Sequence, residues 1–406
     1  MKPDQVALGV LLALVGALLF PLPLRGGDPH VKPVPIVDLH VDLSYQTNFK
    51  GKPFTIGTGQ YAAAELAEAG VVGVVLPLYV PADVSPRGPR VQDLESSYAR
   101  VYAELSRTVP YGLPGCTVHG RRVRTWLSLE GAAPLVGDPG AARRWVARGV
   151  RLFGLVHAED NRVAASSTGS GHGQRGLTPE GRRLVRQIHE AGGIVDVSHA
   201  SSQTLREVVE LARAAGRPVV ASHSNARVLA NHPRNLDDDE LRAIASTGGV
   251  VGINLHCPYL ARGRRATLRD VVRHVLHVVD VVGVRHAAIG TDFEGGISPP
   301  AAVPTVHELQ KLPAALREAG LSEASVRAVM AENALRLLCP AQAIGGSWRT
   351  PLGATVRDPA WMSSPNSVSK PSRSGWRASV AMPGLWQHRP LLLASGRPLP
   401  DWWSAR

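Results

Sequence analysis

The amino-acid sequence predicts an α/β protein built as a (β/α)8 barrel, the fold also called a TIM barrel. Three observations support this fold class. Eight short runs rich in Val, Ile and Leu recur along the chain, and they lack polar alternation, as expected for strands buried on both faces of a parallel sheet. Helical patterns separate these runs. With 406 residues, of which 44% are hydrophobic and 19% charged, the chain can fill such a barrel and is too apolar for wholesale disorder.

The expected strands follow one another over most of the chain. They are 35–43, 71–80, 125–131, 150–158, 193–200, 218–226, 249–256 and 286–295. Helices are expected between them, for example at 62–70, 178–193 and 202–216. Thr178 and Pro179 are typical of a helix start, because Thr is a good N-cap and Pro suits the first helical position. An open doubly wound sheet is the structural alternative, but it would normally carry a glycine-rich phosphate loop after its first strand, and no such motif occurs there.

The two ends of the chain depart from this pattern. Residues 6–24 are apolar and carry no charged side chain, which predicts a signal peptide or a membrane anchor within residues 1–30. Either one would place the barrel, expected at 31–340, outside the cytoplasm, as a periplasmic, extracellular or membrane-anchored protein. Residues 341–406 hold six Trp, eight Pro and ten Ser without a period, so we expect a disordered tail. A shifted reading frame and a genuine extension both remain open for this tail.

Charge and cysteine content exclude several classes of protein. Half of the net charge of +12 lies in residues 341–406, and residues 1–340 contain no run of five basic side chains. We therefore expect no nucleic-acid partner. Three scattered cysteines (Cys116, Cys257 and Cys339) and the lack of a Cys-x-x-Cys pair argue against a disulfide framework, a zinc ribbon and a thioredoxin-type redox site.

Polar residues end most of the expected strands. In a barrel, the C-terminal ends of the strands meet at one mouth, where the active sites of this fold lie. Three carboxylates and four imidazoles gathered there would carry a large desolvation cost unless cations balanced them. Oxygen and nitrogen ligands of this kind suit zinc. The residues are His40 and Asp42, which share a face as positions i and i+2 of a strand, and Glu130, His157, His199, His223 and Asp292.

The motifs resemble those of the membrane (renal-type) dipeptidase family, which are binuclear zinc peptidases of the metal-dependent hydrolase superfamily. In chain order they are VDLHVDL, LEG, VHAEDNRVAASS, GLTPEGRRLVRQIHEAGGIVDVSHAS, ASHSNAR, HPRN and IGTDFEG, and they span about residues 35–338. The resemblance implies that the chain is a metallopeptidase that hydrolyses dipeptides by means of a hydroxide bridging two zinc ions. Six side chains would hold these ions: His40, Asp42 and Asp292 at one ion, His199 and His223 at the other, and Glu130 bridging both together with the water or hydroxide.

The resemblance also implies roles in catalysis and substrate binding. His157 would contact the substrate and polarise the scissile carbonyl. Arg234, in the HPRN motif, would bind the substrate's carboxylate; the alternative for Arg234 is a surface position at a helix start. Asp292 is the candidate to accept the proton of the bridging water and to pass it to the leaving amine.

The sequence departs from the family pattern at two places, and two other functions remain possible alternatives. Leu255 and His256 stand where the family more often has Phe-Tyr, which leaves the substrate-side pocket open to question, and Glu294 replaces the more common Asp of the DFxG turn. One alternative is a related barrel hydrolase that acts on another small amide, although such enzymes commonly use a carboxylated lysine as the metal bridge. The other is a non-catalytic barrel that binds metal or peptide. A homodimer and membrane anchoring through residues 6–24 are further expectations.

Overall fold

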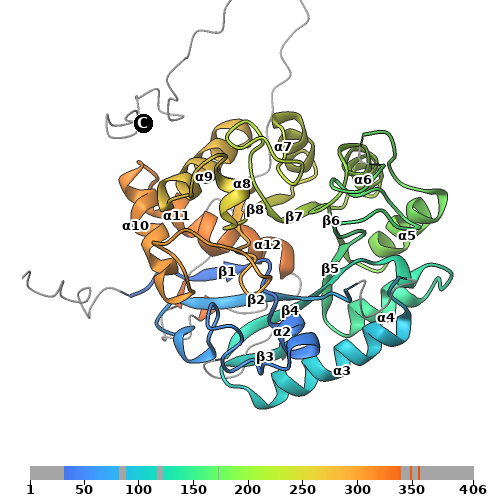
Figure 1. The fold of residues 1–406 in the computed structure, drawn as a ribbon, viewed down its shortest axis with the longest axis horizontal. Coiled ribbons are helices and arrows are strands. Elements are labelled where there is room, and N and C mark those ends of the chain that lie inside the picture. Colours follow the sequence, from blue (N-terminus) through green and yellow to red (C-terminus); the bar gives the residue numbers. More distant parts are fainter. Residues whose placement is uncertain are drawn as a thin grey trace, which may run out of the picture. The chain divides into compact units, whose positions relative to one another are not determined.

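The computed structural model describes residues 32–81, 88–116, 122–171 and 173–339, and two further short strands near the C-terminus. Eight parallel strands close into a barrel with helices around it, as Figure 1 shows. The barrel closes because β1 pairs with both β2 and β9 and because β2 also pairs with β4. The predicted (β/α)8 barrel is confirmed. Its strands are β1 (Ile36–Asp38), β2 (Val71–Leu78), β4 (Val123–Glu130), β5 (Val150–Gly154), β6 (Ile194–Asp196), β7 (Val219–Ser224), β8 (Val250–Ile253) and β9 (Ala287–Ile289).

Every expected strand is present, but several are shorter than expected. The run 35–43 forms a strand only at Ile36–Asp38, because Asp42 is already the N-cap residue of helix α2 (Leu43–Lys50). Backbone bonding to the neighbouring strands nevertheless continues, since the amide of Val41 donates to the carbonyl of Val75. A ninth strand, β3 (Tyr111–Pro114), pairs with the start of β4. The sequence analysis did not predict it, because four residues that include a Gly and a Pro carry no strand pattern.

Helices surround the strands. The longest are α3 (Val91–Arg107), α5 (Pro179–Glu190), α6 (Ser202–Ala214) and α9 (Leu268–Val282), and the others are α4 (Ala141–Ala147), α7 (Asp238–Ala245), α8 (Cys257–Leu260), α10 (Lys311–Glu318), α11 (Glu323–Arg327) and α12 (Asn333–Leu338). The predicted start of α5 is confirmed, because the hydroxyl of Thr178 accepts a hydrogen bond from the amide of Gly181. The helix predicted at 62–70 was wrong. Only a 3-10 turn at Ala63–Glu65 forms there, because the segment after it turns into β2, with Gly70 at a left-handed φ of +71° and the amide of Val71 donating to the carbonyl of Leu66.

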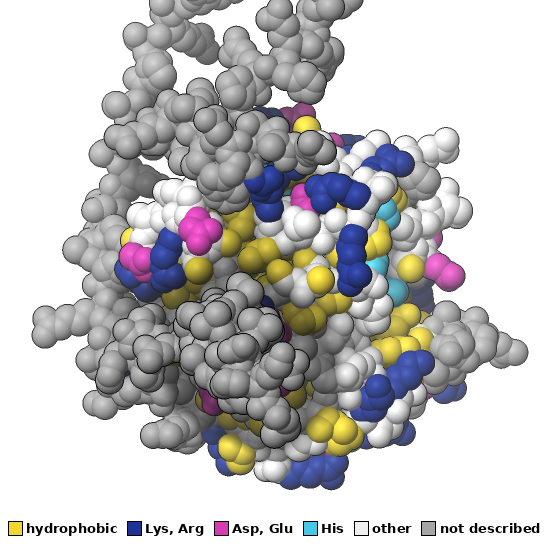
Figure 2. Space-filling model, turned by 60° about the vertical axis from the view of Figure 1, so that its left-hand side comes forward, with side chains coloured by type: hydrophobic (Ala, Val, Ile, Leu, Met, Phe, Trp, Pro, Cys, Tyr) yellow, Lys and Arg dark blue, Asp and Glu magenta, His cyan; other side chains and the backbone are white. Residues whose placement is uncertain are grey.

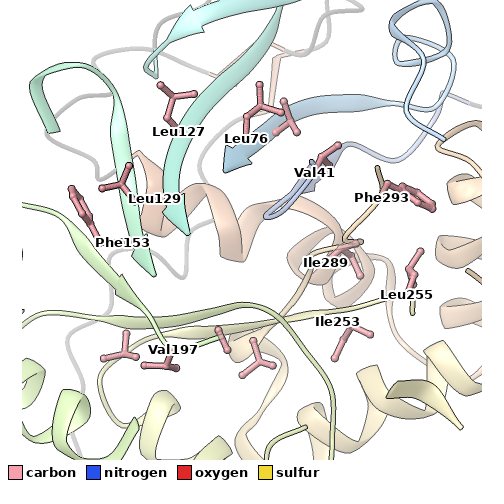
Figure 3. Packing of buried hydrophobic residues seen from close by; sticks show 14 of the residues in the cluster. Val41, Leu76, Leu127, Leu129, Phe153, Val197, Ile253, Leu255, Ile289 and Phe293 are labelled. Carbon is pink, nitrogen blue, oxygen red and sulfur yellow. The ribbon is translucent and has the colours of Figure 1, made fainter. Parts of the chain in front are cut away.

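Two groups of buried side chains hold the barrel together. The larger one lies between strands and helices, and Figure 3 shows part of it, with Leu127 of β4, Phe153 of β5 and Ile289 of β9 among its members. The smaller one gathers residues from near the start of the strands, such as Val72 of β2 and Ile194 of β6, together with residues of α12. The starts of the strands are therefore packed with apolar side chains. The polar residues predicted by the sequence lie at the opposite ends.

A disulfide joins Cys116, just after β3, to Cys339, just after α12, across 223 residues of sequence. Cys257 is buried and free. The sequence analysis, which argued against a disulfide framework, did not foresee this single pair, because two cysteines so far apart carry no local signal of their proximity. A disulfide that closes a long loop typically contributes about 2–4 kcal/mol to the free energy of unfolding. This bond therefore links the end of α12 to the segment between β3 and β4.

The predicted terminal segments fall mainly outside the described residues. The signal or anchor predicted within 1–30 lies outside them, and of the tail at 341–406 the structure describes only an antiparallel pair, β10 (Trp348–Arg349) and β11 (Thr355–Val356). Among the described residues, no helix combines the length and the apolar character that a membrane crossing needs. On the face drawn in Figure 2, Lys and Arg side chains form several separate groups, so this face does not carry a single basic patch.

Candidate metal centre

The seven polar residues predicted at the strand ends lie together at the C-terminal mouth of the barrel. Their potential ligand atoms fall into three groups, and within each group the atoms lie within 4.8 Å of one another. His40 and Glu130 each belong to two of these groups, so the side chains form one continuous cluster. The groups are His40, Glu130 and His223; Glu130, His157 and His199; and His40, Asp42 and Asp292.

Glu130, the last residue of β4, lies at the middle of the cluster. Its Oε1 atom is 3.1 Å from Nε2 of His199 and 3.7 Å from Nε2 of His40. The same oxygen is 3.8 Å from Nε2 of His223 and 3.9 Å from Nε2 of His157. One carboxylate thus faces four imidazoles that come from four other strands, so oxygen and nitrogen ligands suited to a divalent cation meet here.

The two other carboxylates lie on the far side of His40. The Nε2 atom of His40 is 3.4 Å from Oδ2 of Asp42 and 3.9 Å from Oδ1 of Asp292. The second oxygen of Asp292, Oδ2, accepts a hydrogen bond of 2.9 Å from the side-chain amide of Asn254, which follows β8. One half of the cluster is therefore rich in carboxylates, and the other half is rich in imidazoles.

Several nitrogen atoms in the cluster have no hydrogen-bond partner among the described residues. Both ring nitrogens of His40 and Nδ1 of His199 are buried without one. The Nε2 atoms of His199 and His223 face each other at 3.0 Å. The protein alone provides no hydrogen-bond donor for these nitrogen lone pairs, whereas a cation between the rings and the carboxylates would bind them. The side chains present therefore fit a divalent metal centre.

The ionisation of the carboxylates is consistent with this fit. Burial raises the pKa of Glu130 to about 8 and the pKa of Asp292 to about 7, although the nearby charge of His40 opposes both changes. Burial alone would lower the pKa of His40, but the charges of Glu130, Asp42 and Asp292 raise it to about 10. Without a metal, the negative charge of the buried carboxylates is compensated only by protons bound to the cluster. A bound cation would replace those protons.

The other imidazoles are held in their neutral form, which is the form that binds metals. Burial, followed by the positive charge of Arg234, lowers the pKa of His199 well below its ordinary value and lowers that of His157 to about 4. Burial and the charge of His40 lower the pKa of His223 in the same direction. His157 differs from the others in its exposure, since 34% of its side chain reaches solvent against 2% for His223. It is therefore the imidazole best placed to meet a ligand.

A buried aspartate holds the strand ends β1 and β9 together beside the cluster. Asp38 accepts hydrogen bonds from the amide of His40 at 3.2 Å and from the amide and hydroxyl of Thr291 at 2.9 and 2.6 Å. His40 is itself a candidate ligand, and Thr291 directly precedes Asp292. Asp38 therefore fixes the backbone from which His40 and Asp292 project.

A second buried aspartate does the same for β6 and β7. Asp196 accepts hydrogen bonds from the amides of Ser198 and Ser222, both at 3.0 Å, and from the hydroxyl of Ser222. The Ser222 oxygen lies 2.8 Å from Nδ1 of His223. Because the hydroxyl proton is given to Asp196, the Ser222 oxygen accepts the proton of Nδ1. This leaves the lone pair of His223 on Nε2, which faces the cluster.

Two candidate ligands adopt backbone conformations that non-glycine residues rarely use. The φ angles are +69° at His199 and +65° at Asp292. Such left-handed residues cost roughly 1–2 kcal/mol each. Both lie three residues beyond the end of a strand, so the bend turns their side chains into the mouth of the barrel. Backbone strain of this kind is typical of functional sites.

Arg234 is buried beside the cluster, with 4% of its surface exposed. Its Nη2 atom donates to the carbonyl of His223 at 3.2 Å, and its Nε atom is buried without a partner. No described carboxylate lies within ion-pair distance of it. The alternative of a surface residue at a helix start is therefore wrong, and the cap of α7 is Asp237. A buried guanidinium without a counter-ion can receive a carboxylate from a ligand.

Sequence reasoning missed the residues that support the candidate ligands. Asp38, Asp196 and Asn254 each lie at or just after the end of a strand, and the alternation Asp38, His40, Asp42 is a signal that could have indicated the first of them. Glu294, noted as a departure, is fully buried and accepts hydrogen bonds from the amides of Thr58 and Tyr61. Its carboxylate therefore holds the loop before β2.

Comparison with known proteins identifies the same family over most of the chain. Residues 30–350 match the family model for membrane dipeptidase, peptidase family M19. An uncharacterized dipeptidase of Schizosaccharomyces pombe is 32% identical over 231 residues, which cover 56% of each chain. Dipeptidase verJ of Clonostachys rogersoniana is 33% identical over 218 residues, covering 53% of this chain and 55% of that protein. The matched part thus spans about half the length of these curated relatives.

Solved structures agree with this comparison. The dipeptidase AC, a metallopeptidase of family M19, has a TM-score of 0.66 at 26% identity, and the match covers 77% of this chain and 100% of that one. A metallopeptidase from Rhodobacter sphaeroides liganded with a phosphinate mimic of the dipeptide L-Ala-D-Ala has a TM-score of 0.63 at 25% identity, over 75% and 99% of the two chains. The family model covers well over half of the sequence, and the resemblance of its motifs is confirmed. This chain belongs to the membrane dipeptidase family, peptidase family M19.

Proposed function

We propose that this protein is a zinc-dependent dipeptidase that hydrolyses dipeptides with a free C-terminal carboxylate. The observation that carries the proposal is the placement of one Glu130 oxygen among four imidazoles, beside the buried Arg234 that has no counter-ion among the described residues. Family membership supports it, and so does the Rhodobacter sphaeroides relative that holds a dipeptide mimic.

The cluster would hold two zinc ions through six side chains. Bound there, zinc would polarise the scissile carbonyl and lower the pKa of a water molecule towards neutrality. Family membership supports this assignment: His40, Asp42 and Asp292 at one ion, His199 and His223 at the other, and Glu130 at both. The distance of 3.0 Å between the Nε2 atoms of His199 and His223 supports their assignment to the same ion.

The remaining steps belong to groups of the protein. Asp292 would take up the proton of the attacking water and deliver it to the nitrogen of the leaving amine as the peptide C–N bond breaks, and the amide of Asn254, which donates to its Oδ2 atom, would hold the carboxylate in place. The ring of His157 would donate a hydrogen bond to the carbonyl oxygen as negative charge develops there. Arg234 would pair with the C-terminal carboxylate of the substrate, in a buried setting where such a pair is strong.

We also propose that the barrel acts outside the cytoplasm, exported or anchored through residues 6–24. The disulfide between Cys116 and Cys339 supports this location, because structural disulfides persist mainly in oxidising compartments. The apolar, uncharged character of residues 6–24 supports a signal peptide or an anchor.

Removal of the metal is expected to abolish hydrolysis. Purified protein should contain about two zinc ions per chain, and treatment with a chelator followed by dialysis should remove both the zinc and the activity. Metal content is measured by mass spectrometry and hydrolysis by release of free amino acids. Added zinc should restore the activity. Full turnover by protein shown to be free of metal would contradict the proposal.

Asp292→Asn is expected to lower kcat by at least about 100-fold, because the amide that replaces the carboxylate cannot accept the proton. The substitution keeps the size of the side chain. Zinc content and thermal unfolding are measured on the same preparation, so that loss of metal or fold is detected separately. Asp239→Asn, at a side chain that is 94% exposed, is the matched control. Wild-type turnover in Asp292→Asn would remove this residue from the proton-transfer role.

Arg234→Met is expected to lower kcat/KM for a dipeptide by about 100-fold, which corresponds to about 3 kcal/mol of lost pairing with the carboxylate. The same dipeptide with its C-terminus blocked as an amide should be a poor substrate for both proteins and should respond little to the substitution. The comparison isolates the carboxylate from any general disturbance of the site. An equal loss for both substrates would show that Arg234 acts in some other way.

Fractionation of cells that produce the full chain is expected to place it in the exported or membrane fraction. A variant with charges in the apolar run, Leu14→Arg with Leu18→Arg, should remain in the cytoplasm, because the run would no longer serve as a signal or an anchor. Immunoblotting of the fractions measures the distribution. Retention of the unmodified chain in the cytoplasm would contradict the proposed location.

A further inference from the structure

Two histidines that the metal cluster does not use lie beside Arg234. His232 precedes it by two residues, and His256 follows β8. Both rings pack against the ring of Tyr259 in α8, with centroids 4.4 Å away for His232 and 4.7 Å away for His256. The guanidinium of Arg234 lies 5.8 Å from the centroid of the same ring. These four side chains form one patch at the edge of the mouth, the Tyr259 patch.

The hydrogen bonds of the two histidines fix where their protons lie. Nδ1 of His232 accepts from the amide of Arg234 at 3.2 Å, and Nδ1 of His256 accepts from the amide of Ser298 at 3.1 Å. A ring nitrogen that accepts a hydrogen bond carries no proton, so each ring carries its proton on Nε2. Neither Nε2 atom donates to a described residue. The patch therefore offers two N–H donors, and both rings are partly exposed.

The surroundings of these donors are positively charged. Burial lowers the pKa of His232, and the charges of Arg234 and Arg262 lower it further. Burial also lowers the pKa of His256. Within the described part of the chain, no carboxylate lies within ion-pair distance of either histidine or of Arg262. The patch thus consists of hydrogen-bond donors and cations that lack an acidic partner.

The position of the patch relates it to one end of the substrate. In the proposed function, on which this inference rests, Arg234 holds the C-terminal carboxylate. The side chain of that C-terminal residue branches from the adjacent carbon atom, so it lies within a few ångströms of Arg234 and beside the patch.

We propose that the Tyr259 patch recognises the side chain of the C-terminal residue, and that the preferred substrates are dipeptides ending in Asp or Glu. A carboxylate would accept hydrogen bonds from Nε2 of His232 and His256, and the positive charge of Arg262, which acts on His232, would favour it further. An apolar side chain would leave both donors without a partner, and sites with unpaired donors discriminate strongly against such ligands.

The test compares two substrates of the same shape on the zinc-loaded full chain. kcat/KM for Ala-Glu is expected to exceed that for Ala-Gln by at least about 10-fold, because Gln has the same shape but lacks the charge and turns an NH2 donor towards a patch that already consists of donors. In His256→Phe this ratio should fall towards one. Arg262→Gln, at an exposed position, should also lower the ratio and provides a second variant that does not disturb buried packing. His307→Phe, at an exposed position in another part of the chain, is the control and should keep the ratio.

The outcomes separate this inference from the proposed function. If zinc-loaded protein hydrolyses no dipeptide, the proposed function itself fails. If Ala-Glu and Ala-Gln are hydrolysed with equal efficiency, the protein is a dipeptidase but the inference is wrong. If the wild type prefers Ala-Glu and both His256→Phe and Arg262→Gln keep that preference, the acidic side chain is recognised elsewhere. The proposal that the Tyr259 patch recognises it is then wrong.

Discussion

The central constraint on this protein is the burial of three carboxylates and four imidazoles at one end of a barrel. Their ligand atoms approach one another within 4.8 Å in overlapping groups, and placing such groups in a low-dielectric interior without compensation would cost far more than a domain's net stability. Shared protons offset part of this cost, as the raised pKa values of both Glu130 and His40 show. Divalent cations would offset it more completely, since they bind the lone pairs that remain without partners.

The barrel supplies the rigidity that this cluster needs. Each candidate ligand projects from or just beyond a strand end, and the strands are locked to one another by parallel pairing around the whole circle. Apolar packing fills the starts of the strands, where α12 closes against them. Asp38 and Asp196 then join neighbouring strand ends at the mouth. The left-handed backbone at His199 and Asp292 persists because this frame holds it, and the frame thereby determines where the ligands point.

The sequence was most informative where a physical signal is local. Buried parallel strands have an apolar composition that can be recognised from each segment alone, so all eight strands were predicted. Once a barrel was predicted, the polar residues at the strand ends could be placed together at its mouth. The features that the sequence did not predict depend on contacts between residues far apart in the chain. Asp196 bonds to Ser222, which is 26 positions away, and Cys116 bonds to Cys339. Neither pair has a pattern of its own. The wrong helix at 62–70 has a helical composition, but its tertiary setting before β2 overrides that preference.

The position of Arg234 connects this geometry to the bond that the proposed reaction would cut. Its Nη2 atom contacts the carbonyl of His223, a candidate ligand, so its guanidinium lies next to the cluster. In any peptide only one residue separates the C-terminal carboxylate from the last peptide bond. If Arg234 holds that carboxylate, as proposed, an arginine this close to the cluster would present the last bond, and no earlier one, to His157 and Asp292. The side chains next to Arg234 would then be the ones that can distinguish the residue removed.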